Sequence, residues 1–271
     1  MAAIKVDNSK TLQDFETVSN VEPDAYFILM QNGVTKKVPY NVLVERDRRL
    51  IASSEMANLK KAIASGVPEA YNFREGDHFV GPKSAYDYIL SSYDHHYGGY
   101  DNYSVVNIRE WTVAVNTKAT HAWNASGNTD GGCATCSLQK YLEGDVLTNI
   151  KADMTALGLN LLSRGALLSN ATSGGHASSW VWYTKEIVAP SLIEVTGDSA
   201  NIGNYYDIGE ANRPLKAFLK YRFNELIPNA WLWTRQIVSA TAAAYAGFDG
   251  AVGGGSSVTD AARVVGLIDI Y

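Results

Sequence analysis

The chain has 271 residues, of which 46% are hydrophobic and 19% are charged, and its formal net charge is −5. This composition is that of a globular protein with one large or two smaller domains, and the mild acidity argues against a nucleic-acid-binding surface, which would be basic. No apolar run of about eighteen residues predicts a membrane span, and residues 1–18 have no apolar core typical of a signal peptide. We therefore expect folding in a cytoplasm and no membrane insertion.

A β-hairpin is the first predicted element. Residues Asp24–Met30 form an apolar β run, and Val34–Val38 is the return strand. Between them, Gln31-Asn32-Gly33 predicts a tight turn, because Asn and Gly accept the positive φ of a two-residue hairpin loop. An isolated hairpin of this size is marginally stable and needs a partner surface.

A single helix is predicted next, over Tyr40–Ala64, because this stretch lacks Gly and Pro and is rich in helix formers. Ser65-Gly66-Val67-Pro68 ends it. The hairpin and one helix bury too little surface to fold alone, so residues 1–68 are predicted to be an attachment and oligomerisation arm, with a homotrimer as the expected assembly. The apolar side chains expected to contact other subunits or a larger particle are Tyr26, Ile28, Val34, Val38, Leu43 and Leu50.

Residues 69–271 are predicted to form the main domain. Short strands are expected at Phe79–Gly81 and Tyr86–Leu90, and a longer one at Val105–Val115 with Ile108 and Trp111 in the core.

The second half of this domain mixes helices and strands. Helical segments are predicted at Ser137–Tyr141 and Asp145–Leu157, the second with Asp145 as its cap and with apolar residues on one face. A strand at Trp180–Val188, a short helix within Pro190–Val195 and a closing strand at Val264–Ile270 follow. Few helices, many loops and irregular strands indicate an α+β fold.

Two side-chain pairs have residue types that occur in metal or redox sites. Cys133 and Cys136 form a CxxC motif without a second such motif, so we interpret them as small, partly buried residues of a Gly-rich loop. His95 and His96 lie among aspartates, but adjacent histidines on an extended chain point to opposite faces, so a solvated or partner-facing loop is favoured over a metal site. No metal and no cofactor is predicted.

Catalytic motifs are missing from the sequence. It contains no G-x-S-x-G elbow, phosphate-binding loop or dinucleotide fingerprint, so no catalytic residue is predicted and the chain is not expected to be an enzyme. Tyrosines crowd the segment from Tyr86 to Tyr103 among Asn and Asp. This pattern is typical of a sugar- or protein-binding surface, and equally of tyrosines that pack against the domain's own loops or neighbouring subunits.

The C-terminal two-thirds resembles the C-type-lectin-like (formylglycine-generating-enzyme-like) domain of tailed-phage virion proteins and some bacterial surface proteins. Trp231, Leu232 and Arg235 approximate the family's W-L-R motif, whereas Arg263 with Val264-Val265 replaces its G-V-R-P and lacks the proline. The resemblance spans about residues 75–271, and the segments that carry it are Leu161–Trp182, Ala189–Gly197, Tyr206–Phe218, Trp231–Arg235 and Ala262–Ile268.

The N-terminal hairpin also resembles a module that begins phage fibre and appendage proteins, where it joins the virion and often trimerises. Together the two resemblances imply a virion protein, whose partners are capsid or tail proteins and whose lectin-like domain, with two helices and a small, mostly antiparallel sheet, adheres to host glycan or protein. A purely structural capsid or tail cementing protein is the alternative. A third class, an enzyme of the formylglycine-generating type, would need a calcium and reactive-cysteine arrangement that Cys133 and Cys136 do not match in position.

The same resemblance implies that Trp231–Trp233 is a core strand and that Arg235–Asp260 is an exposed loop face. The residues predicted to bind a ligand on that face are Arg235, Tyr245, Phe248 and Asp249.

Overall fold

The computed structural model describes residues 26–31, 34–39, 48–96, 107–171, 177–197, 214–221, 226–227, 231–247 and 252–271, and only the backbone of 26–31, 34–39, 166–171, 177–180 and 252–254. The chain divides into two compact units, Met1–Arg48 and Arg49–Tyr271. Each unit is described by itself.

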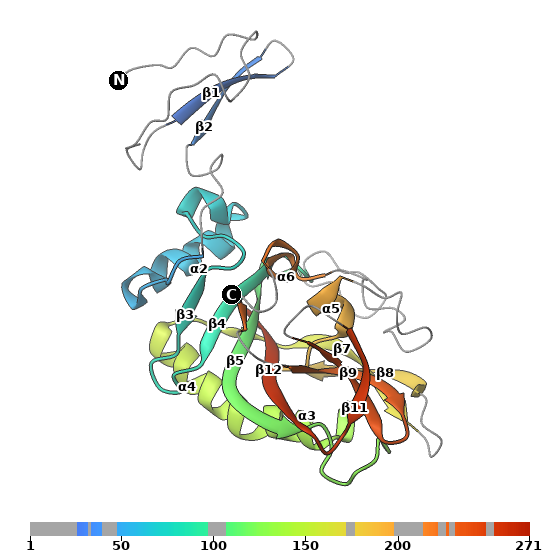
Figure 1. Ribbon diagram of the computed structural model, residues 1–271. Helices are drawn as coiled ribbons and strands as arrows, with labels where there is room; N and C mark the ends of the chain where they lie inside the picture. The colour runs from blue at the N-terminus through green and yellow to red at the C-terminus, as the bar shows by residue number, and fades with distance from the viewer. Residues whose placement is uncertain are drawn as a thin grey trace. The chain divides into compact units, whose positions relative to one another are not determined.

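The first unit contains the predicted hairpin (Figure 1). Strands β1 (Tyr26–Gln31) and β2 (Val34–Pro39) pair antiparallel, from Tyr26 opposite Pro39 to Gln31 opposite Val34. This register leaves two residues, Asn32 and Gly33, between the strands, as the Asn-Gly signal requires. Of the predicted contact residues, Tyr26, Ile28, Val34 and Val38 belong to these strands, and Leu43 lies outside the described residues.

The predicted long helix is shorter and belongs to the second unit. A 3₁₀ turn, η2 (Ser53–Glu55), leads into α2 (Met56–Ser65), which ends at Gly66 with φ of 79°. The helix buries Met56, Leu59, Ala62 and Ile63 in the core of the second unit. The boundary between the units therefore lies at Arg48 rather than at residue 68, because this apolar face packs on the larger core. The sixth predicted contact residue, Leu50, is 60% exposed there.

One sheet organises the second unit, in the order β11-β10-β9-β12-β5-β4-β3, with β6 paired to β12. Strand β12 lies at its centre, antiparallel to β5 and parallel to β9. The strands are β3 (His78–Val80), β4 (Asp87–Tyr93), β5 (Trp111–Ala122), β6 (Leu161–Leu162), β9 (Leu232–Ser239), β10 (Ala242–Ala246), β11 (Val252–Ser257) and β12 (Ala261–Ile270).

The closing strand was predicted correctly. Ile270 pairs with Trp111 and Ala261 with Ala122, so the last residues run beside the first long strand of the sheet. Trp111 is buried as expected, whereas Ile108 precedes β5 and is 43% exposed, so its prediction as a core residue is wrong. The prediction of an exposed loop at Arg235–Asp260 is also wrong, because most of that stretch forms β9, β10 and β11 of the sheet.

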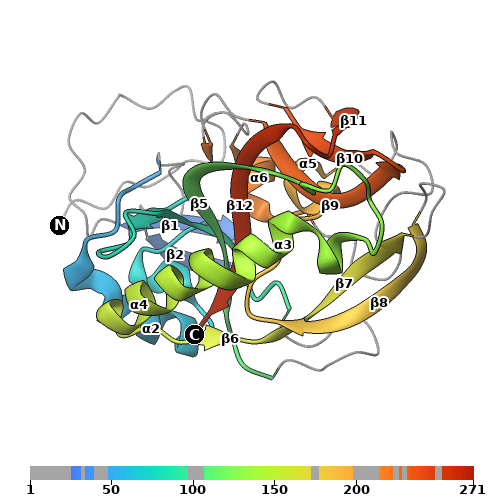
Figure 2. The ribbon, with the colours of Figure 1, turned by 90° about the horizontal axis from the view of Figure 1, so that it is seen from below.

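A helical rod lies across β5 and β12 (Figure 2). It consists of α3 (Ser137–Tyr141), the π-helical turn η5 (Leu142–Val146) and α4 (Leu147–Leu157). The predicted apolar face is confirmed, since Val146, Ile150 and Met154 are buried. Asp145 lies inside the π turn, so it is not the helix cap that the sequence predicted.

The remaining elements are short. A two-stranded ribbon forms from β7 (Arg164–Ala171) and β8 (Ala177–Lys185), and the 3₁₀ turns η3 (Pro68–Tyr71) and η4 (Cys133–Thr135) connect larger elements. Helices α5 (Leu192–Thr196) and α6 (Lys216–Lys220) complete an α+β fold with a mostly antiparallel sheet. Among the described residues, none of the helices has both the length and the hydropathy needed to span a membrane.

Candidate functional site

The histidine pair follows β4 through a tight turn. Asp94 has a positive φ of 50°, its N–H donates to the Glu110 carbonyl at 2.9 Å, and its carboxylate is paired with Arg109. The turn brings the His95 and His96 rings edge to face at 4.7 Å between centroids. The expectation that the two rings point to opposite faces is therefore wrong, because it assumed an extended backbone. His95 is 6% exposed, so the pair is not a solvated loop.

His96 joins a cluster of charged side chains carried by two strands and the segment before β5. Its Nδ1 lies 3.1 Å from Asp269 Oδ2 in β12, and its Nε2 lies 2.7 Å from the Arg164 guanidinium at the start of β7. A guanidinium only donates hydrogen bonds, so the imidazole nitrogen accepts from Arg164. The backbone N–H of His96 donates to the Glu110 carboxyl group at 2.6 Å, and the Thr112 hydroxyl donates to the Asp269 carboxylate at 2.7 Å.

His95 leads to a second group of charges. Its Nε2 lies 3.9 Å from Glu194 Oε1, and the other oxygen of Glu194 lies 3.2 Å from the Arg235 guanidinium. Glu194 also accepts the Ser191 N–H at 2.6 Å, which completes the capping box of α5. Arg235 in turn donates to the Ala189 carbonyl at 3.1 Å. We call the residues of the two groups together the ion cluster: His95, His96, Glu110, Arg164, Glu194, Arg235 and Asp269.

Burial shifts the pKa values of the ion cluster in ways that reduce its net charge. Burial, with the nearby Asp269, raises the pKa of Glu110 to about 8, and burial, with the neighbouring His96, lowers that of His95 to about 3. For Asp269 and Glu194 burial acts to raise the pKa, but the guanidinium groups outweigh it and hold both carboxyls below their usual range. At neutral pH, two arginines thus face two ionised carboxylates, with His95 neutral and Glu110 protonated.

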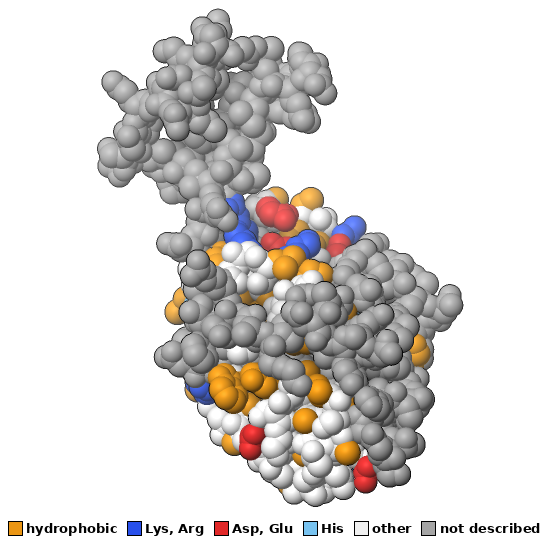
Figure 3. Space-filling model, turned by 45° about the vertical axis from the view of Figure 1, so that its right-hand side comes forward, with side chains coloured by type: hydrophobic (Ala, Val, Ile, Leu, Met, Phe, Trp, Pro, Cys, Tyr) orange, Lys and Arg blue, Asp and Glu red, His pale blue; other side chains and the backbone are white. Residues whose placement is uncertain are grey.

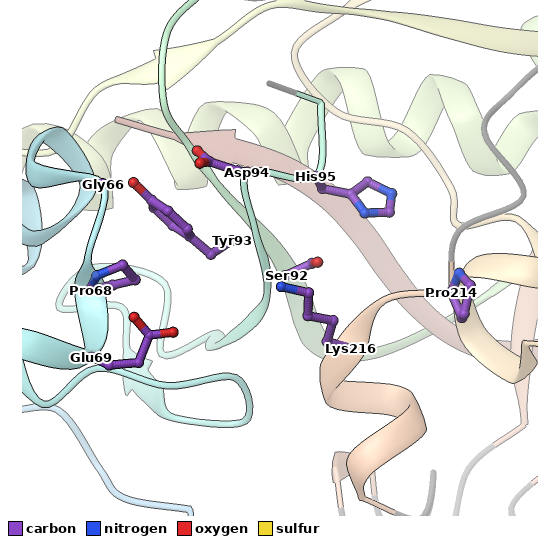
Figure 4. A pocket seen from close by; sticks show the side chains of 9 residues that line it. All are labelled: Gly66, Pro68, Glu69, Ser92, Tyr93, Asp94, His95, Pro214 and Lys216. Carbon is purple, nitrogen blue, oxygen red and sulfur yellow. The ribbon is translucent and has the colours of Figure 1, made fainter. Parts of the chain in front are cut away.

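A pocket of about 380 Å³ opens beside this cluster (Figure 4). Glu69 of η3 and Lys216 of α6 stand on opposite sides of it, and the ammonium of Lys216 lies 3.4 Å from Glu75. The charged residues of its wall are Glu69, Asp94 and Lys216, of which Asp94 is paired with Arg109 and Lys216 with Glu75. Within the described residues no set of His, Cys, Asp and Glu side chains has the arrangement of a metal site. The lining residues are Gly66, Pro68, Glu69, Ser92, Tyr93, Asp94, His95, Pro214 and Lys216.

The predicted ligand-binding residues are separated by the fold. Arg235 is fully buried in β9, so its prediction as a surface contact is wrong: its guanidinium is held by Glu194 and Ala189 inside the protein. Tyr245 lies in β10 and is half-buried. Phe248 and Asp249 lie outside the described residues.

Tyr245 has an aromatic partner that the sequence prediction placed in the core. Trp231 immediately precedes β9, is 48% exposed, and stacks on Tyr245 with 5.0 Å between ring centroids and 16° between ring planes. Trp233, two residues on, is 1% exposed and donates its indole N–H to the His121 carbonyl at 3.0 Å. The sequence signal for this difference is position, because Trp231 stands at the start of the buried run and Trp233 within it.

Both cysteines are free thiols in the interior. The Cys136 sulfur accepts the Gln139 N–H at 3.4 Å at the start of α3, and Cys133 begins η4. They are small residues of a Gly-containing loop, as predicted, but they are fully rather than partly buried.

Glu110, Arg164, Asp269 and the role of Glu194 were not predicted from the sequence. Arg164, Glu194 and Asp269 are lone charges in apolar runs and Glu110 follows Arg109 before such a run, which is the available signal, but the runs are distant in sequence and only the fold brings them together. In the comparisons with known proteins, no family model, curated protein or solved structure matches the chain.

Proposed function

We propose that the chain is a surface protein of a tailed-phage virion, a head fibre, decoration or tail appendage, and that its second unit is displayed for adhesion to the host cell. The sequence resemblances motivate this proposal. The observation that supports it is the ion cluster: Arg164 and Arg235 are paired with Asp269 and Glu194 inside the protein, although His95 also lines the pocket. Arginines and carboxylates paired in this way hold segments of the fold together, whereas a catalytic acid or base must reach its substrate.

The thiols support a non-enzymatic role. A cysteine that reacts needs access and an environment that favours the thiolate. Cys133 and Cys136 are both fully buried, under the start of the helical rod. They are therefore poorly placed for the reactive-cysteine chemistry of formylglycine-generating enzymes.

The surface is compatible with display on a particle. On the face drawn in Figure 3, the described acidic and basic side chains are interspersed, and neither sign forms a continuous patch. A nucleic-acid-binding protein would gather basic side chains on one face. We therefore propose protein and host-surface partners and no nucleic acid.

The experiment uses antibodies against the chain and particles of the phage that encodes it. Gold-labelled antibody should decorate intact particles, and the purified full chain should compete with those particles for adsorption to host cells. Label that appears only after particle disruption, together with no competition, would overturn the adhesion proposal and favour a cementing protein.

A cementing or oligomerising role is favoured by one further observation. Exposed apolar side chains occur around β3 and η3: Leu50 is 60% exposed, Val67 54%, Val80 44% and Tyr71 40%. Leu50 forms a β-bridge with His78 of β3. We propose that these residues take part in a homotrimer or in virion contacts. Sedimentation of the full chain should then give a trimer, and Leu50→Asp should weaken that trimer. If the unmodified chain is a monomer even on the assembled particle, the homotrimer is contradicted.

A further inference from the structure

One aromatic pair of the second unit has a free face and no assigned role. Trp231 is 48% exposed although it immediately precedes β9, whose first six residues are buried, and it stacks nearly parallel on Tyr245 of the adjacent strand β10. Among the described large apolar side chains of β9, β10 and β12 themselves, none is exposed. We call Trp231 and Tyr245 the aromatic platform.

The platform is held in place from two sides. The Trp231 carbonyl accepts the Arg263 N–H of β12 at 2.7 Å, so its backbone is fixed to the central strand. Tyr245 is fixed because it pairs in the sheet with Trp233 of β9, two residues after Trp231. Because the Tyr245 ring covers one face of the indole, rotation of Trp231 would break the stack. The outward face of the indole is thus pre-ordered, which lowers the entropy cost of binding.

We propose that the aromatic platform is a carbohydrate subsite, in which the apolar C–H face of a pyranose ring stacks on the outward face of Trp231. The face of an aromatic ring is electron-rich, and the C–H groups of a sugar are weakly positive, so the contact adds an electrostatic attraction to apolar burial. This inference rests on the proposed adhesive function and names the ligand class for it.

The size of the exposed area favours a sugar over a protein. Half of a Trp surface is about 100 Å², because aromatic residues bury roughly 150–250 Å² in full. A stable protein interface needs about 800 Å² from each partner. Among the described residues, Leu50, Val67, Tyr71 and Val80 are exposed around β3, at the other end of the sheet from β9 and β10, and the remaining large exposed apolar side chains, Ile108, Val181 and Leu219, lie outside β9 and β10. The platform therefore matches one sugar ring, whereas the β3 region is the place for a protein partner.

Glycan-array binding of the full chain, followed by titration with the best oligosaccharide, tests the proposal. Trp231→Ala should weaken binding by about tenfold, and Trp231→Phe by less, because a smaller ring still stacks. Ile108→Ala is the matched control, since Ile108 is a 43% exposed apolar side chain before β5 with no assigned binding role, and it should leave sugar binding unchanged. Circular dichroism of all variants verifies folding, and Trp231→Phe keeps the test valid if Trp231→Ala misfolds.

The outcomes separate this inference from the proposed function. Equal sugar affinity in Trp231→Ala, Trp231→Phe and the unmodified chain would overturn the subsite. A chain that binds no sugar but still competes with particles for host cells would also overturn it, while the adhesive function stands and a protein receptor is indicated. Conversely, a chain that binds sugar through Trp231 but is not displayed on intact particles would overturn the proposed function and leave the subsite in place.

Discussion

Two regions at β9 use their functional side chains in opposite ways. Arg235, within the strand, is completely buried and held by Glu194, whereas Trp231, just before it, is half exposed and stacked on Tyr245. Arg235 is charged, as expected of a binding-site residue, but it lies in the interior. Trp231 is apolar, as expected of a core residue, but it faces solvent. Residue type alone therefore misassigns both, and burial decides the role of each.

Breaking the ion cluster should have the largest effect on stability. Arg235→Met leaves the Glu194 carboxylate buried without its guanidinium partner, so the free energy of unfolding should fall by about 3–5 kcal/mol. The matched control is Lys151→Met, which removes an exposed pair with Glu186 at 2.6 Å and should cost less than about 1 kcal/mol. Urea denaturation measures both, and equal losses would show that the Arg235 pair is no more important than a surface pair.

A second interior carboxylate should be nearly as sensitive. Asp153 of α4 is fully buried and accepts hydrogen bonds from the Lys83 N–H and the Tyr88 hydroxyl, each at 2.7 Å. Asp153→Asn leaves one accepting oxygen where the carboxylate had two, so either the Lys83 N–H loses its acceptor or the Tyr88 hydroxyl must turn to accept from the NH₂, and we expect a loss of about 2–3 kcal/mol. Tyr88→Phe removes one of the bonds and should cost about 1 kcal/mol in the same urea titration. The reverse order of the two losses would contradict this role for Asp153.

The pH dependence of stability should reflect Glu110 and His95. Folded Glu110 keeps a proton, with a pKa of about 8, that the unfolded chain releases near 4.5, so stability falls as the pH rises through that window. Folded His95, with a pKa of about 3, stays neutral at pH values where the same histidine of the unfolded chain, with a pKa of 6.5, is protonated. Stability therefore rises with pH between 3 and 6.5.

These opposing slopes, each about 1.4 kcal/mol per pH unit, cancel between pH 4.5 and 6.5. From pH 6.5 to 8 only the Glu110 slope remains, and stability should fall by about 2 kcal/mol. Glu110→Gln should abolish this alkaline fall in urea titrations at each pH. An alkaline fall that persists in Glu110→Gln would assign it to another group.

The smallest effect on stability is expected for the exposed residue, Trp231. Trp231→Ala should lower the free energy of unfolding by less than about 1 kcal/mol, because much of the indole is already in water. Trp233→Ala, on the same strand but 1% exposed, should cost about 3–5 kcal/mol. Similar thermal shifts for the two variants would mean that Trp231 is a structural residue after all.

Local patterns in the sequence were sufficient for several elements. Asn32-Gly33 between two apolar runs predicted the register of the β1–β2 hairpin, because turn geometry fixes which residues pair. The spacing of Val146, Ile150 and Met154 predicted the buried face of α4, because the helical period is set by the backbone. The apolar run at the C-terminus predicted β12 for a similar reason.

Only the tertiary structure decided where the chemistry lies. Asp94 takes a positive φ that turned both histidines inward, and no pattern in the surrounding residues signals it. Glu110, Arg164 and Asp269 are far apart in the chain and meet because β12 returns beside β5 at the base of β7. Trp231 and Trp233 have the same side chain but differ in exposure. Trp231 precedes β9, whereas Trp233 lies within β9, a strand with neighbouring strands on both sides. Amino-acid types thus specified the local elements, whereas burial, which depends on contacts between distant segments, determined which side chains can meet a ligand.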